Sequence, residues 1–129
     1  MKIHHLGIAV ADLAESIMFY RDSLGLELIG EEEVPEQKVH VAMFRCGESR
    51  IELLAPMSPE SPIAGFLEKK GPGLHHLAIA IENIESEIIK MAAAGVKMID
   101  EKPRSGAGGH RIAFVHPKST RGVLLELVE

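Results

Sequence analysis

An internal repeat is the feature that most constrains how this chain can fold. Residues 4–13 read HHLGIAVADL and residues 75–84 read HHLAIAIENI, at an offset of 71 positions. A second match, at an offset of 74, joins IELL at residues 51–54 to LELV at residues 125–128. Each half therefore begins with a strand that carries a histidine and ends with a strand that carries a glutamate. Two copies of one small unit are expected.

Each half is predicted to be a βαβββ unit. Residues 3–10 alternate between two kinds of side chain, as in a strand with two different faces. Asp12 can cap the helix that follows, which ends at Gly25. Asn83 and Gly95 bracket the equivalent helix of the second half. The remaining strands are expected near residues 26–33, 39–46 and 50–55, and near residues 96–101, 110–116 and 122–128.

We therefore predict an α+β fold in which the two βαβββ repeats form a half-open barrel around a shared metal cleft. Residues 1–129 are expected to form a single domain. Repeat one covers about 1–56, a linker about 57–73, and repeat two about 74–129. The linker is rich in Pro, Gly and Ser and contains a short helical segment around residues 63–70.

Four polar side chains are predicted to meet at one metal ion: His5, Glu52, His76 and Glu126. Strand alternation turns each of them to the face opposite the helix, among apolar neighbours. Burying such groups is costly without compensation, which a divalent cation supplies. Their symmetric placement favours a shared site over independent accidents. Two imidazoles and two carboxylates suit Co, Mn, Ni, Zn or Mg without distinguishing among them.

The other histidines are predicted to lie outside this site. His4 and His75 are one residue out of phase with the inward positions, so their side chains are expected to point away. His40, His110 and His116 have no partners at metal-ligand spacing.

The ligand set also predicts a kind of chemistry. Four protein ligands leave two adjacent positions of an octahedral ion for a substrate with two oxygen atoms. The carbon between those oxygens becomes more acidic when the metal stabilises the enolate, and a nearby carboxylate can take and return the proton. An isomerase or a lyase without redox chemistry is expected.

The chain resembles the vicinal oxygen chelate superfamily and, within it, the methylmalonyl-CoA epimerase family, almost from end to end. The motif HLGIAV at residues 5–10 is generic to the superfamily. The segments GGHRIAFVHPKS at residues 108–119 and GVLLEL at residues 122–127 are the most discriminating. Further matches are VPEQ at residues 34–37, IELL at residues 51–54 and GLHHLA at residues 73–78.

The resemblance implies an enzyme that interconverts (R)- and (S)-methylmalonyl-CoA by moving the proton at C2 through an enolate. It assigns metal ligation to the same four residues, and it implies that Glu126 is also the base on one side of the substrate. Bacterial members carry a second glutamate where this chain has Val41. We expect Glu52, which replaces a Gln of some members, to serve as the second catalytic carboxylate. A metal-bound water and His40 are the alternatives.

Other functions on the same fold remain open. A glyoxalase I-type lactoylglutathione lyase would use the same four ligands, but that branch usually has Asp-Pro-Asp-Gly where residues 116–119 read HPKS. A metal-free module that sequesters a ligand would have no reason to keep four metal ligands. An extradiol dioxygenase would use two histidines and one glutamate with iron. Residues 105–109, SGAGG, form either a flexible turn or a backbone that closes over an anionic substrate group.

Composition excludes several partners. The net charge of −5 and the lack of a basic stripe argue against nucleic acid, and no apolar run approaches the ~20 residues of a membrane span. The single cysteine, Cys46, favours a cytoplasmic setting. The resemblance implies a CoA thioester substrate and a homodimer. Basic residues that could receive the CoA tail, without a firm assignment, are Lys69, Lys70, Arg104, Arg111 and Lys118.

Overall fold

The computed structural model describes all residues from 1 to 129, which divide into two compact units. The N-terminal unit comprises His5–His75, and the C-terminal unit comprises Met1–His4 together with His76–Glu129. Each unit has the βαβββ order that the repeat predicts, which confirms an α+β fold. No helix is long and apolar enough to cross a membrane.

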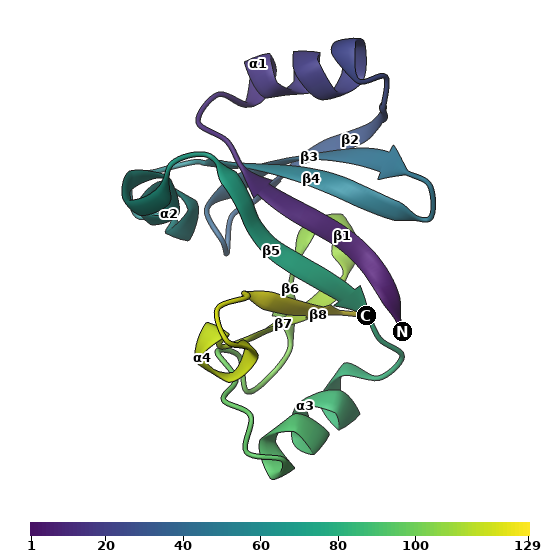
Figure 1. The fold of residues 1–129 in the computed structure, drawn as a ribbon, viewed down its shortest axis with the longest axis vertical. Coiled ribbons are helices and arrows are strands. Elements are labelled where there is room, and N and C mark those ends of the chain that lie inside the picture. Colours follow the sequence, from purple (N-terminus) through teal and green to yellow (C-terminus); the bar gives the residue numbers. More distant parts are fainter. The chain divides into compact units, whose positions relative to one another are not determined.

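The N-terminal unit is built on four strands in the order β2-β3-β4-β1. Strand β1 runs parallel to β4, whereas β3 is antiparallel to both β2 and β4. A helix lies across one face of this sheet and a second helix follows the last strand (Figure 1). The elements are β1 (Lys2–Ala9), α1 (Leu13–Met18), the π-helical turn η1 (Phe19–Ser23), β2 (Glu27–Val34), β3 (Val39–Cys46), β4 (Ser49–Pro56) and α2 (Pro62–Lys70).

The C-terminal unit repeats this plan in the order β5-β8-β7-β6. Strand β5 is parallel to β8, and β8, β7 and β6 are antiparallel to one another. The elements are β5 (Gly73–Ala80), α3 (Ile84–Ala93), β6 (Arg104–Ser105), the 3-10 turn η2 (Ala107–Gly109), β7 (Arg111–Val115), α4 (Pro117–Thr120) and β8 (Leu125–Val128).

The two equivalent helices begin at the predicted caps. The Asp12 side chain accepts a hydrogen bond from the backbone N–H of Glu15 at 3.0 Å. The Asn83 side chain accepts one from the backbone N–H of Ser86 at 2.9 Å. Each bond satisfies a donor that the first turn of a helix leaves without a partner. The repeated sequence therefore sets the start of the helix in both units.

Each sheet buries one face under its own helix, which we call the helix face. In the N-terminal unit, Ile17 of α1 packs on Phe44 and Leu53, and both strand residues are fully buried. In the C-terminal unit, Ile84 of α3 packs with Leu127 on the same pattern. The opposite faces carry His5 of β1 and His76 of β5, and we call them the histidine faces.

One predicted strand is wrong. Residues 96–101 form no strand, and Met98 makes only an isolated bridge with Val115. The cause is a contact between distant residues, because the Asp100 side chain accepts a hydrogen bond from the backbone N–H of Phe114 at 2.9 Å. A side chain thus takes the place of a backbone partner, and pairing with β7 resumes only at Arg104. The edge strand β6 therefore has two residues.

Candidate metal centre

The pairing of residues across neighbouring strands determines which side chains lie on the histidine face of the N-terminal unit. Glu52 on β4 lies opposite Gly7 on β1 and Met43 on β3. Residues opposite each other in such pairs share a face of the sheet. The neighbours of Glu52 are thus small or apolar, and its carboxylate lies among groups that cannot solvate it.

His5 and Glu52 meet on this face. Nδ1 of His5 lies 3.2 Å from Oε2 of Glu52, and each residue is only 4% exposed. The histidine comes from the first strand of the unit and the glutamate from its fourth, which run parallel and adjacent. Because both strands are fixed by backbone ladders, the contact is held by the fold.

His76 and Glu126 form the same contact in the C-terminal unit. Nε2 of His76 lies 3.1 Å from Oε2 of Glu126, and the residues are 8% and 5% exposed. Glu126 lies opposite Ala78 and Phe114, as Glu52 lies opposite Gly7 and Met43. The Phe114 ring stands edge-on to His76, with ring centroids 5.6 Å apart. The structure therefore brings the four predicted residues together as two matched pairs, one in each unit.

The donor chemistry of both pairs fits a divalent cation. Two ligand atoms that each lie about 2.1 Å from an octahedral ion, at right angles, are about 3.0 Å apart. The nitrogen–oxygen separations of 3.2 Å and 3.1 Å in the two pairs are close to this spacing. A buried carboxylate also needs a cation or hydrogen-bond donors to offset its desolvation. Each pair can therefore offer one imidazole and one carboxylate to such an ion.

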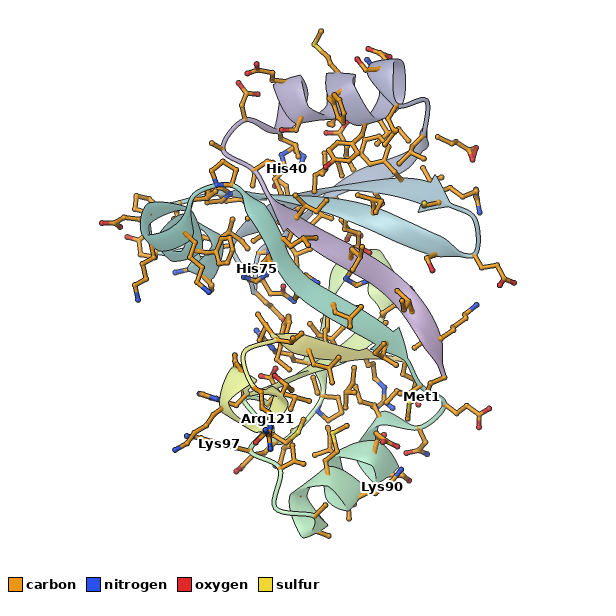
Figure 2. All side chains as sticks on the ribbon, viewed as in Figure 1. Met1, His40, His75, Lys90, Lys97 and Arg121 are labelled. Carbon is orange, nitrogen blue, oxygen red and sulfur yellow. The ribbon has the colours of Figure 1, made fainter.

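The histidines one residue away have other neighbours. The His75 ring packs edge-on against Phe66 of α2, with centroids 4.9 Å apart (Figure 2). The His4 ring packs edge-on against His110, with centroids 4.8 Å apart. His40 is half-exposed, and its Nε2 lies 3.6 Å from Glu31.

His116 has a structural role at the start of α4. Its side chain accepts a hydrogen bond from the backbone N–H of Lys118 at 3.0 Å and so caps the helix. The motif HPKS thus builds a short capped turn, and Pro117 occupies the first helical position.

Arg104, one of the basic residues considered for substrate binding, lies on the same face of the sheet as His76 and Glu126. It lies opposite Ile112 on the histidine face, and its guanidinium carbon is 5.6 Å from the centre of the Phe114 ring. The same ring contacts His76. Nε of Arg104 lies 3.1 Å from Asp100. A cation is thus held beside one half of the candidate site.

The other four basic candidates lie elsewhere. Arg111 is bound by Glu85 and Glu129, and this pairing raises its pKa. Lys118 is exposed on α4, and Lys69 and Lys70 are exposed at the end of α2.

Glu32 was not among the residues predicted for the site. This residue lies on β2 directly opposite Val41, the position where a second glutamate was sought. Glu32 is half-buried, whereas Glu31 and Glu33 on either side are exposed. Three consecutive glutamates in the sequence resemble a solvent-exposed edge strand. Only the alternation of exposed and half-buried residues in the folded strand distinguishes the middle one.

Comparison with known proteins gives a consistent result. The model of the Glyoxalase/Bleomycin resistance protein/Dioxygenase superfamily matches residues 4–114. Human mitochondrial methylmalonyl-CoA epimerase is 37% identical over 98% of this chain and 72% of its own length. The ethylmalonyl-CoA/methylmalonyl-CoA epimerase of Cereibacter sphaeroides is 37% identical over 98% of this chain and 96% of its own. A variant of Streptomyces coelicolor methylmalonyl-CoA epimerase, solved with 2-nitronate-propionyl-CoA, matches with a TM-score of 0.96 and 36% identity, covering 99% of this chain and 93% of that one.

Proposed function

The chain belongs to the Glyoxalase/Bleomycin resistance protein/Dioxygenase superfamily, and on this basis we propose that it is an epimerase that interconverts (R)- and (S)-methylmalonyl-CoA. One observation carries the proposal. Two matched, buried His–Glu pairs occur in a chain that aligns over nearly its whole length with proteins named methylmalonyl-CoA epimerase. A glyoxalase I-type lyase is the less well supported alternative.

The proposal includes one divalent cation held by His5, Glu52, His76 and Glu126. It requires the two sheets to join as the half-open barrel predicted from the repeat. The donor set suits Co, Mn, Ni, Zn or Mg, and we assign none of them. When bound, such an ion would draw electron density from the substrate's carbonyl oxygens and make the C2 hydrogen more acidic.

The carboxylates of the chain would move the proton. Glu126 lies in an apolar setting opposite Ala78 and Phe114, so it can remove the C2 proton from one face of the substrate and return it there. Glu52 is its twin and is the carboxylate that the sequence offers for the other face. Surrounding apolar residues would keep bulk water from quenching the enolate.

The substrate is an anion, and the proposal gives Arg104 a part in holding it. The substrate carries a free carboxylate at the reacting end and phosphates at the CoA end, while the chain as a whole has a net charge of −5. Local cations must therefore offset the repulsion. Arg104 is already held over Phe114 on the histidine face, so little side-chain entropy is lost when an anion binds.

Hydrogen exchange at C2 tests this function directly. We expect the protein, loaded in turn with each of the five ions, to exchange the C2 hydrogen of both enantiomers in deuterium oxide and to yield a mixture of the two. Mass spectrometry and separation of the enantiomers measure both. A lack of exchange with every ion would refute the epimerase. Turnover of the methylglyoxal–glutathione hemithioacetal in its place would support the lyase.

We also propose a cytoplasmic homodimer. The single cysteine, Cys46, is unpaired and exposed, which suits a reducing compartment. On α1 and the turn η1, Met18, Phe19 and Leu24 are each more than half exposed and form an apolar surface that a second copy could cover. Light scattering of the purified protein measures the oligomeric state, and a monomer at micromolar concentration would contradict the dimer.

A further inference from the structure

Inversion at C2 sets a requirement that Glu126 alone cannot meet. One face of the substrate must lose a proton while the opposite face gains one, so two proton-carrying groups are needed on opposite sides. The position where a second glutamate was sought holds Val41, which cannot carry a proton and is 1% exposed. This inference rests on the proposed epimerase function and concerns the second group.

Two rows of residues cross the histidine face of the N-terminal unit. One row contains Glu52 and runs through Gly7, Met43 and Gly30 on the neighbouring strands. The adjacent row runs from Ala9 through Leu54 and Val41 to Glu32. Glu32 is therefore on the same face as Glu52, one row and two strands away, which corresponds to roughly 12 Å between Cα atoms.

The neighbours of Glu32 on this face are Gly30, two residues away on the same strand, and Val41 opposite. The Met43 side chain covers Gly30, because its Cε lies 3.4 Å from where a Cβ of Gly30 would be, whereas the Val41 side chain is short. Because Val41 and Glu32 are directly paired, the longer glutamate can extend over the valine toward the space that a glutamate at position 41 would occupy. A glutamate one strand further out can thus serve the same region.

The repeat gives Glu32 an equivalent position in the C-terminal unit, which a charged residue also occupies. Glu32 lies opposite Val41, which in turn pairs with Leu54. In the C-terminal unit, Arg104 lies opposite Ile112, which pairs with Val128. Glu32 and Arg104 therefore occupy equivalent positions on the two edge strands. The chain carries one charged residue of each sign at this twin position.

We propose that Glu32 is the second catalytic carboxylate and is the proton-carrying partner of Glu126. For one enantiomer, the Glu32 carboxylate takes the C2 proton, so that an O–H bond forms while the C–H bond breaks and its electron pair enters the thioester enolate. Glu126, protonated at that stage, donates its proton to the other face, and a new C–H bond forms there. The other enantiomer reacts by the reverse sequence, and no other reactant is consumed.

Glu32→Gln tests the assignment, because it keeps size and polarity but cannot carry a proton. We expect epimerisation to fall by about 10²–10⁴-fold. In deuterium oxide, the enantiomer served by Glu126 should still exchange its C2 hydrogen with retention, whereas exchange of the other enantiomer should be lost. Calorimetric titration with Co, independent of turnover, should give the wild-type affinity for Glu32→Gln and a weakened affinity for Glu52→Gln.

Glu33→Gln is the matched control, since this neighbour is exposed on the opposite face, across from His40. It should exchange both enantiomers at the wild-type rate. If wild-type protein exchanges both enantiomers and Glu32→Gln does so equally, the assignment of Glu32 is wrong while the epimerase stands. If Glu52→Gln alone shows the one-sided loss, Glu52 is the second base. If the wild-type protein exchanges neither, the proposed function itself fails.

Discussion

Single residues on the histidine faces combine burial with charge. His5, Glu52, His76 and Glu126 are each at most 8% exposed, although ionisable groups are rarely buried to this degree. Each glutamate contacts a histidine. A neutral imidazole can bind a cation through nitrogen, whereas a lysine or arginine would repel one. The choice of partner thus favours metal binding over a simple ion pair.

Residue-level prediction from the sequence succeeded where alternation was strict. The inward phase of His5 and His76 follows from the strand period, and both are buried as predicted. The face of the sheet on which Glu32 lies could not be predicted, because β2 carries three glutamates in succession and a register irregularity between Leu28 and Gly30. Without the partner strand, the sequence did not show which of three glutamates shares a face with Glu52.

At this scale, Arg104→Met tests the cation beside Phe114. Methionine keeps an unbranched apolar stem over the ring but removes the charge. Losing a charge-assisted contact to substrate, worth about 1.5–3 kcal/mol, should raise KM for methylmalonyl-CoA by roughly 10–100-fold with a smaller change in kcat. Steady-state kinetics on the metal-loaded protein measures both constants. Lys90→Met, an exposed position on α3 (Figure 2), is the control, and equal KM values for the two variants would contradict a role for Arg104.

The observed helices and strands agree best with the prediction where the two halves of the chain repeat the same capping and strand residues. The caps at Asp12 and Asn83, the helices and most strands agree with their predicted positions. The segment at 96–101 differs because a tertiary contact, from Asp100 to the backbone of Phe114, decides its path. Hydrophobic alternation cannot reveal that a carboxylate has replaced a strand partner. The short helix α4 depends similarly on the His116 cap.

Gly106 fixes how closely the loop after β6 approaches β7. A Cβ atom at this position would lie 2.7 Å from Cγ2 of Ile112, whose side chain is 2% exposed and has little room to move. We expect Gly106→Ala to lower the free energy of unfolding by about 1–3 kcal/mol, measured by urea denaturation.

Gly65→Ala provides the matched control for that substitution. Gly65 lies within α2, and a Cβ there meets nothing within 4 Å. Alanine in a helix interior is favoured over glycine by about 0.5–1 kcal/mol, so this variant should be more stable than the wild type. Equal stability of Gly106→Ala and the wild type would show that Ile112 yields and that the close approach is not required.

The ion pairs of Arg111 connect α3, β7 and the C-terminal residue, and they predict a pH dependence. Arg111 donates hydrogen bonds to Glu85 at 2.8 Å and to Glu129 at 2.9 Å. The bond to Arg111 holds the pKa of Glu85 below its ordinary value of 4.5. A lowered folded-state pKa contributes stability above the unfolded value, and this contribution is lost as the pH falls through the folded value.

Arg111→Met should therefore lower Tm at pH 7 but have little effect well below pH 4.5. Thermal denaturation of both proteins at the two pH values measures this difference. The contributions of the other carboxylates to the pH dependence cancel in the Tm difference because both proteins contain them. The groups are exposed, so added salt should reduce the effect at pH 7. A Tm difference that is the same at both pH values would contradict the electrostatic origin.

At the scale of the whole molecule, duplication explains why each unit carries half of a ligand set. One imidazole and one carboxylate bind a divalent cation weakly, so neither unit alone has a reason to bury its pair. The shared ion that we propose would give both pairs a function and would couple the stability of one half to that of the other. Duplicated sequence thus makes a stronger prediction about the site than either motif alone.

Two single variants, His5→Ala and His76→Ala, distinguish one ion shared by both units from one ion in each unit. A cation at 100 times its Kd should raise the free energy of unfolding of the wild type by about 2.7 kcal/mol, seen as a higher Tm. If the ion is shared, each substitution, although it lies in a different unit, should abolish this shift and all tight binding. Calorimetry should give one ion per wild-type chain and none for either variant, while His40→Ala binds as the wild type does. Two ions per wild-type chain, falling to one in each variant, would instead show that the pairs bind independently, and the four residues would then form two sites rather than one.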